Sequence, residues 1–164
     1  MSSDYHNSTQ RSATLEEETR TTIEEARMVL PGIQALFGFQ LVAVFNGRFQ
    51  DLTGVEQVLH LIALLMVAIA VGLIMTPAAY HRIAERGIVS RKFVDLASRF
   101  IECAMLPLMF GIAIDLFLLA RLILKQVPLS AAVAIAMLLI LLTLWYVFPW
   151  TAVALRARRR EHKS

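Results

Sequence analysis

Asp115 is the residue that most strongly indicates chemistry, because it lies in the apolar stretch CAMLPLMFGIAIDLFLLA with no polar residue beside it. If this stretch crosses a bilayer, a charge near its centre costs about 2.5–3.5 kcal/mol even on insertion scales, so such residues usually face protein or water. Asp115 shares a helical stripe with Ala104, Leu108 and Gly111, and small residues let a second helix approach closely. We therefore expect Asp115 to face a helix-packing surface and not lipid.

Two further polar residues lie at similar depths in other apolar segments. At 1.5 Å per residue, Asp115 lies about 12 Å, His60 about 7–8 Å and Gln40 about 13 Å from the same bilayer surface. The three side chains are expected to form a hydrogen-bonded cluster if they face the same interior. Arg121 and Glu56 are expected above this cluster, nearer the outer surface.

Two interpretations of the cluster remain open. In the first, it belongs to an ion or proton pathway, and Asp115 and His60 exchange protons or bind a cation along an outward-opening cavity. In the second, Asp115 is protonated or paired with Arg121 and only locks the helices together. Gln34 and Glu102 form another polar pair near the inner end, where a structural role is the simpler expectation.

Four apolar segments would position these residues. Of the 164 residues, 57% are hydrophobic, and the mean hydropathy is +0.62. The apolar residues occur in blocks that approach the length of about 17–25 residues needed to cross a bilayer. We therefore predict an all-α integral membrane bundle of four transmembrane helices, over the ranges 30–49, 55–79, 100–123 and 127–155.

The polar segments have their own patterns. Thr14 and Glu17 have capping-box spacing, and Arg20 precedes Glu24 by four residues, as in a solvent-exposed helix. Apolar residues repeat at helical spacing over 93–100, which predicts an interfacial helix in the loop before the third span. No apolar signal-peptide core precedes the first span, so we expect that span to be retained. The other predictions are a disordered tail over 1–13, a cytoplasmic amphipathic helix over 14–29 and a basic cytoplasmic tail over 156–164.

The basic residues indicate how the spans are oriented. Thirteen of the sixteen Lys and Arg residues lie in the N-terminal tail, the loop between the second and third spans and the C-terminal tail. Basic residues favour the cytoplasmic side, so both termini and this loop are expected there. The basic loop and tail are expected to contact anionic lipids of the bilayer, which explains the net charge of +3 without a nucleic-acid partner.

Other classes of protein and site lack their signatures. His60 and His81 lie at opposite ends of one span, about 31 Å apart by helical rise, so one chain would not hold a bis-histidine haem between them. Cys103 is the only cysteine, and no close set of zinc ligands shares a helical face. P-loop, GxSxG and HExxH motifs are missing. We expect no enzyme activity, no cofactor and no metal.

The strings LPGIQALFGFQ and TPAAYHR are the most specific parts of a resemblance that covers roughly residues 25 to 125. Here the chain resembles an uncharacterised bacterial family of small four-helix integral membrane proteins, whose members are sometimes labelled sodium/proton antiporters by automatic transfer. The resemblance implies four spans in a bacterial inner membrane. It also implies importance for Pro31, Gly32, Gln34, Gly38, Gln40, Arg48, Pro77, Tyr80, His81 and Arg82.

Pro77 would loosen the last turn of the second span and expose backbone carbonyl groups there. Tyr80, His81 and Arg82 are expected to lie at the cytoplasmic interface, either as anchors or as a gate or docking site.

Two functions fit these patterns. The first is a small ion or proton-coupled membrane transporter or channel that works as a homo-oligomer, since four spans are few for one chain to enclose a path. The second is a non-catalytic accessory or regulatory membrane protein that docks partners through its cytoplasmic segments. Polar residues on three spans favour the first function, whereas the missing internal repeat counts against it.

Overall fold

The computed structural model describes residues 17, 20, 21, 24, 28–84, 91–152 and 154. This part of the chain contains helices, short connections and no strand, which confirms the predicted all-α fold. The elements in chain order are the first helix Met28–Ala43, the 3₁₀ helix η1 Gly47–Asp51, α2 Gly54–Ala84, α3 Arg91–Leu124, α4 Val127–Leu142 and the π-helix η2 Thr143–Val147.

In the part of the chain that the structure describes, three helices are long and apolar enough to cross a membrane, as is typical of a multi-pass membrane protein. Their apolar stretches are Gly54–Tyr80, Phe93–Leu124 and Val127–Ala152, the last of which combines α4, η2 and the helical residues that follow. The first helix is also apolar but shorter, over Met28–Ala43. At 1.5 Å per residue this helix is about 24 Å long, somewhat less than the hydrocarbon thickness of a bilayer.

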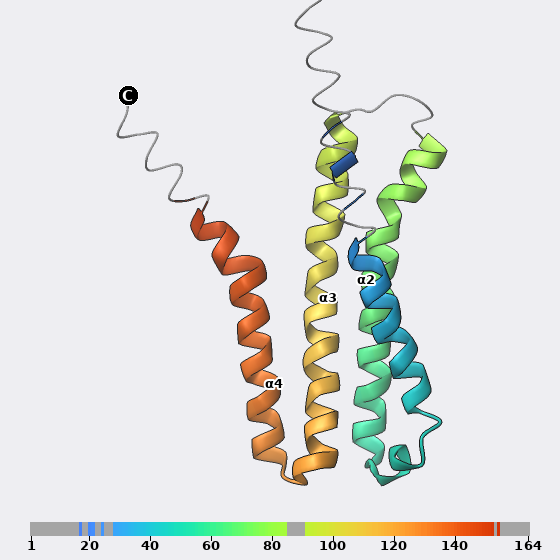
Figure 1. Ribbon diagram of the computed structural model, residues 1–164, viewed down its shortest axis with the longest axis vertical. Coiled ribbons are helices and arrows are strands. Elements are labelled where there is room, and N and C mark those ends of the chain that lie inside the picture. The colour runs from blue at the N-terminus through green and yellow to red at the C-terminus, as the bar shows by residue number, and fades with distance from the viewer. Residues whose placement is uncertain are drawn as a thin grey trace, which may run out of the picture.

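α2 and α3 lie side by side and antiparallel, and the first helix lies against them (Figure 1). η1 and the connection between α3 and α4 are at one end of the bundle, which we call the η1 end. α4 starts at this end and leans away from α3 along its length (Figure 1). The long side chain of Tyr146 still reaches α3, where its hydroxyl donates to the Glu102 carbonyl over 3.0 Å.

The first helix ends before the predicted limit at residue 49. Its α-helical residues stop at Ala43, and Asn46 then accepts a hydrogen bond from the Arg48 backbone N–H over 3.1 Å, which caps η1. Asn-Gly is a strong turn signal, and here it outweighs the apolar residues on either side. Most of the helix predicted over 14–29 lies outside the described residues, although Arg20 and Glu24 form an ion pair of 2.9 Å.

α3 begins earlier than the predicted span over 100–123. It is continuous from Arg91 to Leu124, so the repeat over 93–100 belongs to its first turns, and the separate interfacial helix is wrong. The apolar residues of this repeat pack inside the chain, since Phe93 and Ala97 are buried. A hydropathy window ends where charged residues begin, but a helix continues through them wherever its backbone bonds remain intact.

Specific hydrogen bonds and backbone conformations determine where the helices begin and end at the η1 end. Thr53 and Glu56 form a capping box at the start of α2: the Thr53 backbone N–H and hydroxyl both donate to Glu56 Oε2 over 2.9 Å. At the end of α3, Lys125 has a left-handed φ of 55° and its N–H donates to the Arg121 carbonyl over 3.0 Å. A left-handed residue commonly ends a helix, and Pro128 suits the first turn of the next one.

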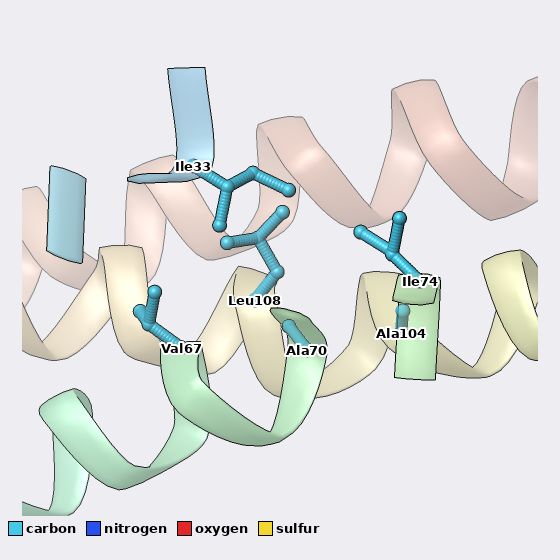
Figure 2. Close-up of a cluster of buried hydrophobic side chains, with 6 residues drawn as sticks. All are labelled: Ile33, Val67, Ala70, Ile74, Ala104 and Leu108. Atoms are coloured by element: carbon cyan, nitrogen blue, oxygen red, sulfur yellow. The ribbon is translucent and has the colours of Figure 1, made fainter. Parts of the chain in front are cut away.

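The core between the first helix, α2 and α3 uses mostly small and aliphatic side chains. Figure 2 shows Ile33 of the first helix above residues from α2 and α3. Without a hydrophobic driving force in lipid, close packing of small residues holds helices together. The buried cluster consists of Ile33, Val67, Ala70, Ile74, Ala104 and Leu108.

Gly111 of α3 lies directly against α2. A Cβ atom at this position would lie 3.0 Å from Val67 Cγ2 and 3.3 Å from the Ala63 carbonyl oxygen. The carbonyl oxygen belongs to the α2 backbone and does not move independently of the helix. This confirms that the stripe through Gly111 and Asp115 is a helix-packing surface.

Gly111→Val is expected to destabilise the protein by about 1–3 kcal/mol, the usual range for overpacking a well-packed core. The valine would push α2 and α3 apart and so loosen the contact one turn further along at Asp115. Unfolding in mixed micelles with increasing SDS measures the change. Gly72→Val is the matched control, because a Cβ at Gly72 meets no atom within 4 Å. Equal losses in both variants would show that helix propensity, and not close approach, is responsible.

Candidate functional site

Gln40, His60 and Asp115 meet in the half of the bundle nearer the η1 end. Gln40 lies in the last turn of the first helix, His60 in the second turn of α2, and Asp115 in α3 one turn beyond Gly111. Gln40 and His60 are buried, and Asp115 is partly buried. The structure therefore brings together the three polar residues whose depths match in the sequence, and we call them the polar cluster.

His60 is held by the end of the first helix. Its Nε2 lies 2.9 Å from the main-chain carbonyl oxygen of Gln40. This carbonyl is one of the last four in its helix, which lack the usual partner four residues further on. A carbonyl oxygen only accepts hydrogen bonds, so Nε2 is the nitrogen that carries a proton. The ring edge also packs against Phe49, with ring centroids 5.4 Å apart at an angle of 68°.

The second ring nitrogen of His60 faces Asp115. Nδ1 lies 3.7 Å from Asp115 Oδ1, and the two side chains are only 9% and 21% exposed. Since Nε2 is already committed as a donor, Nδ1 is the ring nitrogen that faces the carboxyl group. The gap is longer than a direct hydrogen bond, so a small movement or a bridging water is needed to join the two groups.

Gln40 completes the cluster from the first helix. Its Nε2 donates a short hydrogen bond to Asp115 Oδ2. The Oε1 of the same amide is buried, with no hydrogen-bond partner in the described part of the chain. Buried polar atoms are nearly always paired, and an unpaired one calls for an explanation such as a bound molecule. Gln40 itself is only 3% exposed.

A cavity of about 430 Å³ adjoins the polar cluster, between the first helix, η1 and α3. We call it the η1 pocket. The polar side chains in its lining belong to Gln40, Asn46, Arg48, His60 and Asp115. Most of the remaining wall is apolar, and its larger side chains are Leu36, Phe39, Phe49, Leu52, Leu118, Leu119 and Leu122. A mostly apolar cavity with a few convergent polar groups is the usual form of a ligand site.

Arg121 pairs with Glu56 and not with Asp115. Its Nε lies 2.7 Å from Glu56 Oε1, and both side chains are largely buried, at 20% and 10% exposed. The predicted pairing of Asp115 with Arg121 is therefore wrong, and the other form of that interpretation, a protonated Asp115 that locks the helices together, stays a prediction. Glu56 takes part in two interactions, because its other carboxylate oxygen accepts the hydrogen bonds from Thr53 that cap α2. This ion pair fastens α2 to α3 at the η1 end.

The polar residues predicted near the other end are not brought together. Gln34 and Glu102 are both exposed, and no hydrogen bond joins these two described side chains. Tyr80 is exposed and stacks on Phe93, with ring centroids 6.4 Å apart at 12°. Arg82 is exposed too, whereas the side chain of His81 lies outside the described residues. The role of these three at an interface stays a prediction.

Sequence reasoning missed some of the residues that build this end of the bundle. Thr53 has the signature T-x-x-E with Glu56, which could have been found at the start of the second span. Asn46 and Phe49 line the η1 pocket and have no distinctive motif beyond the Asn-Gly turn. Within the described residues, no group of three or more His, Cys, Asp or Glu side chains is placed to hold a metal ion.

Comparison with known proteins identifies a family. Neither a curated protein nor a solved structure is significantly similar to the chain. A family of unknown function, DUF6328, matches residues 9–149. The match includes every residue of the polar cluster, the η1 pocket and the ion pair between Glu56 and Arg121. Because it covers most of the 164 residues, it confirms the resemblance to an uncharacterised family, and the chain belongs to the DUF6328 family.

Proposed function

We propose that the protein is a proton-coupled membrane transporter, or a small ion channel, that works as a homo-oligomer. The observation that carries this proposal is the contact of Asp115 with His60 and Gln40 at the wall of the η1 pocket. Ionisable groups within transmembrane segments are costly and often mark ion or proton pathways. Their position beside a cavity favours this role over simple locking of the bundle.

Asp115 and His60 would act as one proton-carrying pair. Because His60 Nε2 donates to the Gln40 carbonyl, a proton bound between the two groups resides either on Nδ1 or on the carboxyl group. Both arrangements contain the same number of protons and the same net charge. The pair could therefore pass a proton from one group to the other without creating an uncompensated charge in the membrane. Gln40 would hold the carboxyl group in place during this exchange.

The exposed surface of α4 supports assembly into an oligomer. Only 6% of the most apolar stretch of Val127–Ala152 is buried inside the chain, against 28% for Gly54–Tyr80 and 39% for Phe93–Leu124. A second cavity of about 290 Å³ lies between α3 and α4 and is lined by apolar side chains alone. Two or more copies packed through α4 would enclose more of a path than four helices do.

A complementary proposal concerns orientation. We propose that the η1 end faces outward and both termini face the cytoplasm of a bacterial cell. In a Cys103→Ser background, Arg160→Cys should resist a membrane-impermeant maleimide added to intact cells, while Gln126→Cys at the η1 end should react. The background is needed because Cys103 is exposed. Reaction of Arg160→Cys but not of Gln126→Cys would reverse the topology.

A second function has one observation in its favour. The large apolar surface of α4 also suits contact with a different membrane protein, as in an accessory subunit. Purified wild-type protein in proteoliposomes separates the two functions. Flux of protons, sodium, potassium or chloride down an imposed gradient, above that of protein-free liposomes, supports transport. No flux of any of these ions favours the accessory subunit.

A further inference from the structure

The η1 pocket is larger than a proton pathway requires. A proton moves along hydrogen-bonded groups and waters, whereas ligand pockets in proteins occupy about 300–1,000 Å³. The η1 pocket has about 430 Å³, and leucine and phenylalanine side chains form most of its wall. Such a wall contributes little to binding an inorganic ion. Contact between this wall and an apolar molecule contributes much more binding free energy, because both bury apolar surface.

The polar groups at one side of the pocket specify the chemistry of that molecule. Asp115 presents a carboxyl group that is partly exposed to the pocket. Beside it, Gln40 Oε1 is a buried acceptor without a donor. A ligand with a positive charge and N–H groups would pair with the carboxylate, and it would also satisfy Gln40 Oε1 once that amide turns toward the pocket. Phe39 and Phe49 belong to the same wall, and aromatic side chains are the kind that attract cations.

Hydrated metal cations fit these groups less well. Calcium takes about six to eight oxygen ligands and magnesium about six. Within the described residues, the side-chain oxygens that line the pocket are those of Asp115, Gln40 and Asn46. Arg48 also lines the pocket, but it lies within η1 and is exposed. Solvent there screens its charge more strongly than that of Asp115.

We propose that the η1 pocket binds a lipophilic amine in its cationic form, with the ammonium N–H groups on Asp115 and the apolar part against Leu118, Leu119 and Phe39. This deepens the proposed function, on which it rests: the amine is the substrate whose transport is coupled to movement of the proton. Phe39 and Leu119 are themselves exposed on the outside of the bundle. An amphiphile could therefore enter from the lipid.

Binding of three related probes to the full-length protein in nanodiscs tests the proposal. Phenylbutylamine carries a charge and N–H groups, phenylbutyltrimethylammonium carries only the charge, and phenylbutanol has a hydroxyl group and no charge. Isothermal titration should show the amine binding at least about tenfold more tightly than either analogue, as expected for charge-assisted hydrogen bonds. Equal binding of all three probes would show that only apolar partitioning occurs.

Two pocket variants and one matched control locate the binding site. Asp115→Asn should weaken amine binding at least about tenfold, since it removes the charged acceptor. Leu119→Trp should do the same by filling the pocket. Leu61→Trp is the control, because Leu61 is about as exposed as Leu119 and lies outside the pocket lining. Unchanged binding in Asp115→Asn, or equal losses in Leu119→Trp and Leu61→Trp, would overturn the proposal.

Measuring both phenylbutylamine binding and proton flux distinguishes the amine site from the transport function on which it rests. Proton flux without binding of phenylbutylamine would leave the transport function standing and refute the amine site. Binding of the amine through Asp115 without any flux would establish the site and refute transport. Amine binding together with amine-stimulated proton flux in proteoliposomes is the result we expect.

Discussion

Asp115→Asn is expected to abolish ion-driven flux in proteoliposomes while the protein still folds and assembles. Asparagine has nearly the same shape, and its Oδ1 can accept the hydrogen bond that Gln40 Nε2 donates to the carboxyl group. It cannot bind or release a proton. Loss of a positioned acid or base typically slows a proton transfer by about a hundredfold or more. Stopped-flow measurement with a pH-sensitive dye inside the liposomes gives the rate.

The same substitution elsewhere on α3 provides the control. Asp95 is exposed on that helix, so Asp95→Asn should leave the flux unchanged. His60→Gln should also reduce flux strongly, because it removes the imidazole ring nitrogen that lies next to Asp115. If Asp115→Asn retains the wild-type flux but unfolds at a lower temperature, the carboxyl group only stabilises the bundle.

Removing one partner of the ion pair between Glu56 and Arg121 is expected to destabilise the protein by about 3 kcal/mol or more. Arg121→Met leaves the largely buried Glu56 carboxylate without its 2.7 Å partner. An unpaired buried charge costs more than the pair itself contributes. The free energy of unfolding in mixed SDS micelles measures the effect.

Two further variants separate the ion pair from the helix cap. In Glu56→Gln/Arg121→Met both charges are gone, and glutamine can still accept from Thr53, so most of the stability should return. Thr53→Ala removes the hydroxyl of the capping box but keeps the ion pair, and should cost only about 1 kcal/mol. A double variant no more stable than Arg121→Met would show that the packing of the arginine stem, and not its charge, stabilises this end of the bundle.

The sequence predicts depth along a helix much better than rotation about it. Helical rise placed Gln40, His60 and Asp115 in the same layer, and the structure brings them into contact. Whether they face each other depends on packing between helices, to which Gly111 contributes. Asp115 and Arg121 are six residues apart on α3, which puts them about 120° apart around the axis. The wrong pairing of these two residues could therefore have been recognised from helical periodicity alone.

The positions of helix ends and the packing of side chains explain most of the remaining differences between the predicted and the observed structure. The hydropathy pattern predicted that the first helix continues past Asn46. In the structure the helix ends before the Asn-Gly turn, where Asn46 caps η1. The same pattern predicted that the third span begins near residue 100, whereas the helix α3 begins at Arg91. One interpretation of the polar cluster included a cavity, but the size and lining of the η1 pocket could not be predicted, since they depend on how side chains from separate elements fill space. The unpaired Oε1 of Gln40 has the same origin.

The π-helix η2 changes which side of the fourth helix faces the bundle. An α-helix turns about 100° per residue, and a π-helical turn accommodates one additional residue. Residues beyond Thr143–Val147 are therefore rotated relative to an uninterrupted helix that starts at Val127. Within this turn, Trp145 packs against the core and Tyr146 reaches Glu102. Deleting the additional residue would restore a regular α-helix and leave the aromatic end facing the core, whereas replacing the π-helical turn by an α-helical one without a deletion would rotate that end by about a quarter of a revolution, so this segment is constrained by angle as well as by membrane thickness.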